Sequence, residues 1–241
     1  DAQLATARVA NLDSSKVDIS GANAGVAIGS LRGAGSVSLG ANTLTLGGLN
    51  LDDAISGAID GTGALNKTGT GTLTLSGPNS YTGTTTIASG TLRAGAVNTL
   101  SAASAHSVAA GATLDLAGAS QTVASLANSG TVSLVGSTPG TRLTVTGAYV
   151  GNNGTLRLGT ALGDSSSATD RLVLDGAGAS ASGRTTVQVT NLGGLGAQTT
   201  GSGIEVVSAL NGATTTAQTT KSAFTLAGGH VDAGAFEYTL H

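Results

Sequence analysis

Short segments in which apolar residues alternate with polar or small residues recur along the whole chain. In a β-strand this alternation puts both apolar residues on one face and the residue between them on the other. The pattern therefore predicts many short strands, each with one buried aliphatic face. The clearest segments are Val17-Asp18-Ile19, Val26-Ala27-Ile28, Val37-Ser38-Leu39, Leu44-Thr45-Leu46, Leu73-Thr74-Leu75, Leu114-Asp115-Leu116, Val132-Ser133-Leu134, Leu143-Thr144-Val145 and Leu156-Arg157-Leu158.

Connectors rich in Gly, Asn, Ser and Ala separate these segments. Such residues permit sharp corners and positive φ angles. A single coil of about 20 residues buries too few side chains to offset the cost of ordering its backbone, so coils of that length must stack on one another. A step of about 20 residues, typical of a solenoid repeat, separates the leucines at Leu73, Leu92, Leu114, Leu134 and Leu156.

Stacked coils place like residues above one another in parallel sheets. Threonine suits such sheets because its branched Cβ fits a pleated surface and its hydroxyl can bond to the next coil. We therefore predict an all-β protein with a right-handed parallel β-helix (solenoid) over residues 1 to about 145. An antiparallel sandwich is the alternative, but the glycine-rich corners and the repeat length favour the β-helix. We interpret residues 102–110 as a loop or the edge of a coil, because Gly111 and the threonine-rich surroundings disfavour a helix.

Composition narrows the class of protein. The 241 residues include 39 glycines and no cysteine, with 2% aromatic and 10% charged residues, so the core has to be aliphatic. The net charge is −3 and the basic residues are scattered singly, which argues against nucleic-acid binding. The sequence contains no signal peptide and no apolar run long enough to span a membrane. We therefore expect any export signal or anchor to lie outside it, and Asp1 not to be a natural translation start.

One stretch carries a specific signature. It runs through Lys67-Thr68-Gly69-Thr70-Gly71-Thr72-Leu73-Thr74-Leu75-Ser76-Gly77, then Asn79-Ser80-Tyr81-Thr82-Gly83, then Thr85-Thr86-Ile87 and Gly90-Thr91-Leu92-Arg93-Ala94-Gly95. This stretch, at about residues 65–95, resembles the passenger-associated transport repeat of bacterial autotransporters. The match covers nearly the whole repeat in order.

The last third of the chain resembles the pertactin-like autochaperone region, which in that family lies just before the outer-membrane translocator barrel. The resemblance divides the chain into a β-helix stalk, residues 1–145, and an autochaperone region with a β-rich cap, residues 146–241. It rests on Asn153-Gly154-Thr155-Leu156-Arg157-Leu158, Thr169-Asp170-Arg171-Leu172-Val173-Leu174, Val187-Gln188-Val189-Thr190-Asn191-Leu192-Gly193-Gly194, Gly203-Ile204-Glu205-Val206-Val207 and Val231-Asp232-Ala233-Gly234-Ala235-Phe236-Glu237-Tyr238-Thr239-Leu240.

The family implies type V secretion, with a passenger that is exported across the outer membrane of a Gram-negative bacterium to the cell surface or the extracellular space. Its implied partner is the protein's own β-barrel translocator. An adhesin or virulence factor is the expected parent, with host surface proteins, matrix proteins or self-association as possible targets. The alternative is the stalk of a passenger enzyme, a protease or esterase, whose catalytic domain lies upstream. The absence of cysteine fits passage through a narrow pore.

Large side chains gather at the C-terminal end. Three of the five aromatic residues, Phe224, Phe236 and Tyr238, lie in the last 20 residues. The open end of a solenoid exposes unpaired strand edges and core, which must be covered. In an extended strand Phe236, Tyr238 and Leu240 share one face. We therefore predict that Phe224, Phe236, Tyr238 and Leu240 form the cap and the folding nucleus; the polar run 214–220 precedes them.

No residue pattern supports catalysis, a metal or a cofactor. Gly163-Asp164-Ser165-Ser166 resembles the nucleophile block of GDS-type esterases, but the partner Asp and His are in the wrong order at Asp232 and His230. We interpret Ser165 as a loop residue and the acidic cluster of Asp52, Asp53 and Asp60 as a solvated loop. The histidines are dispersed. Tyr81 and Tyr149 are interpreted as packing residues, and Asp170-Arg171 as a candidate ion pair at a strand start.

Overall fold

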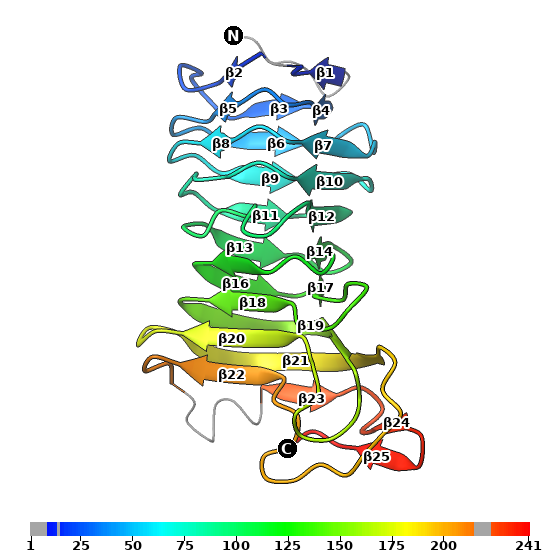
Figure 1. Cartoon of the computed structure of the whole chain (residues 1–241). Helices are drawn as coiled ribbons and strands as arrows, with labels where there is room; N and C mark the ends of the chain where they lie inside the picture. The colour runs from blue at the N-terminus through cyan, green and yellow to red at the C-terminus, as the bar shows by residue number, and fades with distance from the viewer. Residues whose placement is uncertain (1–8, 14, 215–222) are drawn as a thin grey trace.

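The chain folds into a parallel β-helix, as the computed structural model shows for residues 9–13, 15–214 and 223–241 (Figure 1). All ladders between named strands in these residues are parallel, except the one that joins the last two strands. The antiparallel sandwich is therefore wrong, and the all-β parallel β-helix is confirmed. No described residue is helical.

The strands lie on three sides of the solenoid, and the coils between β8 and β15 have no strand on side three. Side one contains β3 (Val26–Ile28), β6 (Leu44–Leu46), β9 (Leu65–Lys67), β11 (Thr85–Ile87), β13 (Ala105–Val108) and β16 (Ser125–Asn128). Side two contains β1 (Val9–Asn11), β4 (Ser30–Arg32), β7 (Asp53–Ile55), β10 (Thr72–Leu75), β12 (Thr91–Ala94), β14 (Thr113–Asp115), β17 (Thr131–Ser133) and β23 (Phe224–Leu226). Side three contains β2 (Val17–Asp18), β5 (Val37–Ser38), β8 (Ile59–Asp60), β15 (Gln121–Val123), β18 (Arg142–Val145), β20 (Arg171–Asp175) and β22 (Val207–Leu210).

Two long strands join sides one and two near the C-terminal end. They are β19 (Ala148–Thr160) and β21 (Ser180–Asn191). Within β19, Tyr149 pairs with β16 on side one, and Leu156 pairs with β17 on side two. A register shift between Asn152 and Gly154 turns the corner between the two sides. The hairpin of β24 (Val231–Ala233) and β25 (Phe236–Tyr238) follows at the C-terminal end.

An aliphatic column fills the core behind side two. It runs through Leu73, Leu92, Leu114, Val132, Leu156, Val187 and Leu226 in successive coils. The predicted step of about 20 residues is therefore real, but the residue in register is Val132 and not Leu134. Leu134 is also buried, two residues further along its coil. The cause is the shorter coil from Leu114 to Val132, which simple leucine counting cannot detect.

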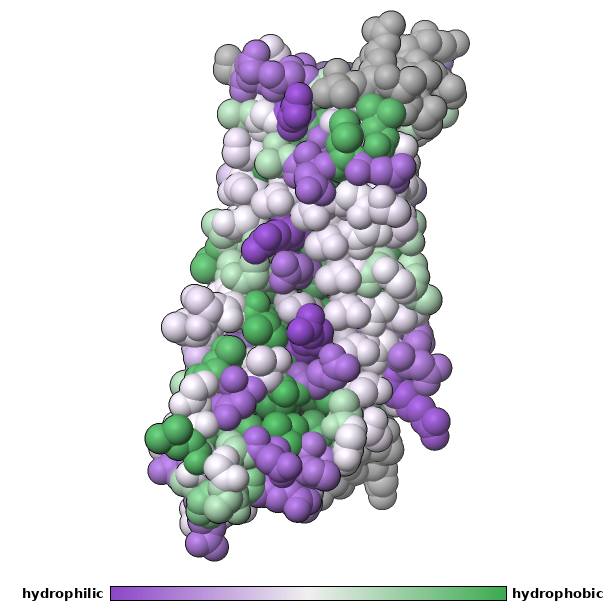
Figure 2. All heavy atoms as spheres, turned by 90° about the vertical axis from the view of Figure 1, so that its right-hand side faces the viewer, coloured by the Kyte–Doolittle hydropathy of each residue, from purple (hydrophilic) through white to green (hydrophobic). Residues whose placement is uncertain are grey.

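A column of threonines stands on the outside of side two. Its members, Thr72, Thr91, Thr113, Thr131, Thr155, Thr186 and Thr225, are in register from β10 to β23. Figure 2 turns this side toward the viewer and shows a band of near-white, weakly polar residues along it. Among the described residues, no hydrogen bond joins neighbouring hydroxyls of this column, so shape and branching rather than hydroxyl pairing suit threonine to it.

The segment 102–110 differs from its prediction. Ala105–Val108 forms β13, with His106 and Val108 buried and Ser107 exposed. The segment does alternate inward and outward residues, but alanine and histidine are weakly apolar, so the hydrophobic pattern of the sequence does not reveal the strand. The solenoid itself continues without interruption from β18 into β19, so the division at residue 145 stays a prediction.

Candidate functional site

The C-terminal hairpin is fastened to the solenoid through one tyrosine. The Tyr238 hydroxyl accepts a hydrogen bond from the Ala197 amide at 2.8 Å, and the carbonyls of Gly163 and Ala197 lie 2.9 Å from it. Since the hydroxyl has one proton, it donates to one carbonyl at a time. Tyr238 thereby links β25 to the segments that follow β19 and β21.

An aromatic pair closes the core one coil above. Phe224 on β23 is buried and stacks on Tyr149 of β19, with ring centroids 5.7 Å apart. The Tyr149 hydroxyl bonds to Thr185 Oγ1 at 2.9 Å, and burial raises the pKa of Tyr149. Tyr149 and Tyr81 are both fully buried, so the prediction that they are packing residues is confirmed.

The other predicted cap residues do not form one apolar lid. Phe236 is 40% exposed, and its ring lies close to Gly196. Leu240 is half-buried and packs against the core, whereas Tyr238 is held by its hydroxyl. The prediction that Phe236, Tyr238 and Leu240 share one face assumes a strand through all three residues. The strand β25 ends at Tyr238, so its alternation does not extend to Leu240. The role of these residues in folding stays a prediction, and residues 215–220 of the polar run lie outside the described residues.

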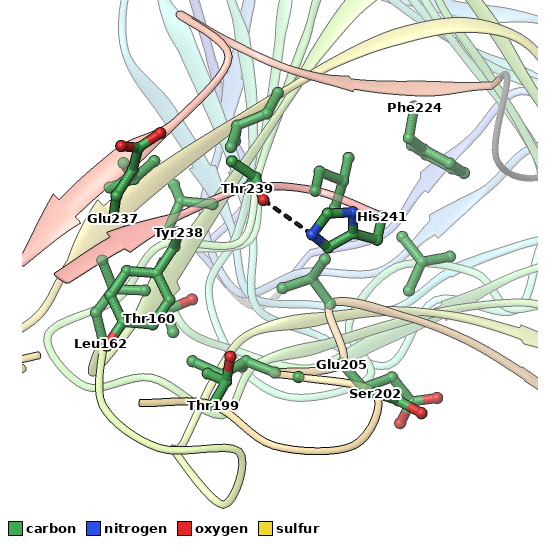
Figure 3. Close-up of a pocket in the computed structure, with 18 of the residues that line it drawn as sticks. Thr160, Leu162, Thr199, Ser202, Glu205, Phe224, Glu237, Tyr238, Thr239 and His241 are labelled. Atoms are coloured by element: carbon green, nitrogen blue, oxygen red, sulfur yellow. Dashed lines mark hydrogen bonds between the residues drawn. The ribbon is translucent and has the colours of Figure 1, made fainter. Parts of the chain in front are cut away.

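A cavity of about 790 Å³ remains between the hairpin and the last coil (Figure 3). Its apolar wall includes Val207, Phe224, Leu226 and Leu240. Its polar lining includes Tyr238 and His241. The Nε2 atom of His241 lies 2.9 Å from Thr239 Oγ1. In Figure 2 hydrophobic residues gather beside hydrophilic ones toward this end of the molecule.

A buried carboxylate supports the coil above the cap. Asp170 is fully buried and accepts hydrogen bonds from the amides of Gly140 and Thr141, both at 2.8 Å, and of Gly159 at 2.7 Å. The expected ion pair with Arg171 is wrong, because Arg171 bonds to Glu205 at 3.0 Å. Asp170 is thus a backbone anchor. Sequence reasoning missed this role because two of its partners lie about 30 residues away in the chain.

The serine of the esterase-like string is bonded to backbone. Ser165 Oγ donates to the Thr200 carbonyl and accepts from the Thr200 amide, both at 2.6 Å. Asp164 accepts from Ser166, which lowers the pKa of its carboxyl. His230 lies near Asp232 and Glu237 on the exposed hairpin, at 3.7 and 3.9 Å. The hydroxyl of Ser165 therefore has no basic partner among the described residues.

The acidic cluster is not one solvated loop. Asp52 is exposed and accepts from the Thr72 amide, and Asp60 is exposed and accepts from Ser38 Oγ. Asp53 is buried in β7 and accepts from Ser30 Oγ, so the solvated-loop prediction is wrong for this residue. Within the described ranges, no group of three metal-binding side chains comes together.

The transport-repeat stretch has its own buried polar residues. On side three, Asn79 accepts from the Ile59 amide at 2.8 Å and donates to the Thr99 carbonyl at 2.6 Å. Its side chain thus bridges the coil before and the coil after, at a point where side three has no strand ladder. Gln121 instead bonds twice to the preceding coil, accepting from the Leu100 amide and donating to the Ala96 carbonyl.

Tyr81 and Lys67 explain two further signature positions. The Tyr81 hydroxyl bonds to Thr85 Oγ1, which in turn bonds to Ser104 Oγ, and burial raises the pKa of Tyr81 to about 12. The Lys67 ammonium is 1% exposed and donates to the carbonyls of Thr68, Gly69 and Ser89. Burial lowers the pKa of Lys67. The stretch marks a coil with an unusually polar interior.

Replacing Asn79 by leucine is expected to lower the free energy of unfolding by about 2–3 kcal/mol, because the Ile59 amide and the Thr99 carbonyl lose their buried partner. Chemical denaturation followed by circular dichroism measures the change. The exposed neighbour Ser80 provides a control, since Ser80→Ala should change stability by less than about 0.5 kcal/mol. Equal stability of both variants would contradict the bridging role of Asn79.

Comparisons with known proteins agree with this architecture. The family described as Autochaperone Domain Type 1 matches residues 121–240, and the Passenger-associated-transport-repeat matches residues 65–94. The uncharacterized protein YuaQ of Escherichia coli K12 is 40% identical over 182 residues, which cover 76% of this chain and 12% of YuaQ. The adhesin BmaC autotransporter of Brucella suis is 38% identical over 200 residues, covering 78% of this chain and 5% of BmaC.

A further relative is the probable autotransporter YfaL of Escherichia coli K12, which is 42% identical over 113 residues, or 46% of this chain and 8% of YfaL. The chain thus spans a small part of the relatives that it matches. The β-helix, the transport repeat and the autochaperone region together define a secreted β-helical passenger. The chain belongs to the autotransporter passengers, which are exported across the outer membrane to the cell surface. Its described residues contain no helix that could cross a membrane.

Proposed function

We propose that this chain is a non-enzymatic structural part of its passenger, in which residues 1–145 form a stalk and residues 146–241 promote folding and outer-membrane translocation. The observation that carries the proposal is the fastening of the terminal hairpin by Tyr238 to segments after β19 and β21. These contacts join positions 41 and 75 residues apart in the chain. A last coil held in place by these contacts presents ordered strands, with which the strands of the preceding coils can pair.

The stacked pair of Phe224 and Tyr149 supports the same proposal. It concentrates large buried side chains in the region that matches the autochaperone family. The coils nearer the N-terminus bury mainly aliphatic residues, with Tyr81 as their one buried aromatic side chain, and each gains stability mainly from its neighbours. We infer that the C-terminal coils fold first and act as the template for the others.

Deletion of residues 196–241 tests the proposal. We expect the remaining coils to lose cooperative refolding after dilution from denaturant, as followed by circular dichroism and by protease resistance. The matched experiment removes a similar length from the N-terminal end, residues 9–55, and should leave refolding of the remainder intact. A fragment 1–150 that is as stable as the corresponding part of the whole chain would contradict the proposal.

A point variant distinguishes the contribution of the Tyr238 hydroxyl to folding from that of the other cap residues. Tyr238→Phe keeps the ring but leaves the Ala197 amide without its acceptor, so we expect slower refolding and a loss of about 1–3 kcal/mol in the free energy of unfolding. Stopped-flow refolding measures the rate. Thr239→Val is the control, because the Thr239 hydroxyl bonds only to exposed His241. Identical rates for both variants would exclude a nucleating role for Tyr238.

We also propose that the parent protein is an adhesin. The support is the relative named adhesin BmaC autotransporter, which shares 38% identity over most of this chain. The partners proposed are the protein's own translocator, and host surface or matrix proteins or a second passenger. Adhesion of bacteria that display the whole protein, compared with bacteria that lack it, is the direct test; unchanged adhesion to matrix-coated surfaces and to one another would contradict the adhesin proposal.

A further inference from the structure

The last coil of the solenoid leaves two strand edges at its C-terminal end. Among the described residues, β22 pairs only with β20, and β23 pairs only with β21. The hairpin β24–β25 pairs with itself and extends neither sheet. An edge strand presents backbone amide and carbonyl groups that can pair with another extended chain.

The cavity of about 790 Å³ lies beside these edges. Phe224 and Leu226 of β23 line it, together with Val207 of β22 and, from the C-terminal segment, Leu240 (Figure 3). In β23, Thr225 belongs to the outer threonine column, so Phe224 and Leu226 point to the inside of the coil. A strand added along β23 would direct every second side chain into this cavity.

The charged groups around the cavity are acidic. Glu205 and Glu237, the two glutamates of the chain, both line it, and their side chains are 54% and 63% exposed. Among the described residues that line it, none is a lysine or arginine. Arg171, which does not line the cavity, forms an ion pair with Glu205. Within the described ranges, the one basic side chain near Glu237 is His230, at 3.9 Å. The rim therefore favours a cationic group and disfavours an anionic one.

We propose that this cavity is a docking site for an extended peptide segment that pairs with the edge of β23, places apolar side chains inside at alternate positions, and carries a basic residue that meets Glu237 and Glu205. Strand addition supplies affinity through the backbone, and the pockets for alternate side chains supply selectivity. The acidic rim opposes an anionic lipid headgroup, which an apolar cavity of this volume would otherwise also suit. The proposal does not depend on the folding role of the cap.

A synthetic peptide tests the proposal with the full chain. The probe is acetyl-Lys-Val-Thr-Val-Thr-Val-Thr-amide with a fluorophore, and we expect saturable binding in fluorescence anisotropy. Replacement of Lys by Glu in the peptide should weaken binding by about tenfold. N-methylation of alternate peptide amides should abolish binding, because methylated amides cannot pair with a strand edge.

Variants of the protein locate the site. Glu237→Gln combined with Glu205→Gln should weaken binding of the lysine peptide by about threefold to tenfold, whereas Asp60→Asn, an exposed carboxylate on a distant coil, should leave it unchanged. Leu240→Trp should crowd the apolar wall of the cavity and abolish binding. Circular dichroism and refolding of each variant, measured in parallel, separate loss of the site from loss of the folding role.

Several results would overturn the proposal. They are the absence of saturable binding, equal binding of the N-methylated or glutamate peptide, and unchanged binding to the Leu240→Trp protein with its native spectrum. Vesicles of phosphatidylglycerol are the lipid probe; binding to them that Leu240→Trp abolishes, without binding of the peptide, would assign the cavity to a lipid instead. A variant that refolds slowly but still binds the peptide would support the proposed folding role of the cap and would not contradict the peptide site.

Discussion

Replacing Asp170 by alanine is expected to lower the free energy of unfolding by about 3–5 kcal/mol, the largest effect that we predict for one substitution. The carboxylate accepts from three backbone amides, and it is fully buried. Its removal leaves the amides of Gly140, Thr141 and Gly159 without acceptors, and each unsatisfied buried donor costs about 1–3 kcal/mol. Denaturant unfolding followed by circular dichroism measures the loss.

Asp164 is the matched control for Asp170. It lies six residues away in the chain, is exposed, and bonds only within its own turn to Ser166. Asp164→Ala should therefore destabilise the protein far less than Asp170→Ala. Asp170→Asn should fall between the two, because one amide oxygen can still accept. Similar losses for Asp170→Ala and Asp164→Ala would show that the three amides find other partners.

Stability is expected to fall by about 3 kcal/mol as the pH drops from 6.5 to 4, with His106 as the cause. His106 is buried between Thr85 and Leu126 of the neighbouring coils. Its Nδ1 donates to the Ser104 carbonyl at 3.0 Å, since a carbonyl can only accept, and its Nε2 has no partner. Burial lowers the pKa of His106 from 6.5 to about 4.

The sign of this pH dependence follows from proton binding. Between pH 6.5 and about 4 the unfolded chain binds a proton at His106 and the folded chain does not. The contribution of neutral His106 is therefore complete above pH 6.5 and is lost as the pH falls toward 4, at about 1.4 kcal/mol per pH unit. Further acidification below pH 4 adds nothing from this residue.

His106→Leu should remove the loss of stability between pH 6.5 and 4 that His106 causes. Denaturant midpoints measured between pH 7 and 4 for the variant and the unchanged protein would show the difference. Leucine is apolar and fits an inward position that leucines occupy in other coils, at Leu65 and Leu126. His230→Leu is the control, because His230 is exposed on the hairpin. A slope between pH 6.5 and 4 that persists in His106→Leu would place its origin in another group.

Local alternation was sufficient to find most of the solenoid. All of the segments that the pattern singled out lie in or overlap strands, from Val17–Asp18 to the second half of β19. Their inward residues are the buried ones, because a strand alternates its side chains whatever lies above or below it. The segment at β13 was missed because Ala105 and His106 are weak apolar signals, although the neighbouring coils force the segment into a strand.

The register between coils and the polar core could not be predicted in the same way. Leucine spacing alone predicts Leu134 in the column, but β17 places Val132 there, since coil lengths differ and only pairing with the next coil fixes the register. Asp53 and Asp170 are buried because of donors 23 and about 30 residues away. No local signal separates these from exposed aspartates such as Asp60.

The candidate site was predicted in part. The clustering of aromatic residues points to the C-terminal end of the solenoid, where Phe224 stacks on Tyr149; that these residues cap the solenoid stays a prediction. The alternation predicts Phe236 inside the cap, yet Phe236 is 40% exposed and its ring lies near Gly196. The Tyr238 hydroxyl holds the hairpin against the solenoid through the Gly163 carbonyl, which lies 75 residues earlier in the chain. The alternation of apolar residues along a strand cannot predict such a contact.

The two long strands have a mechanical consequence. β19 and β21 are joined by twelve residue pairs, interrupted by one register shift, whereas β2 and β5 are joined by two and β3 and β6 by three. A force that pulls along these strands loads the bonds between β19 and β21 in shear, so many must break together. The short ladders near the N-terminal end carry the load over few bonds and give way one coil at a time. The ladder between β19 and β21 therefore resists such a force better than the short ladders nearer the N-terminal end.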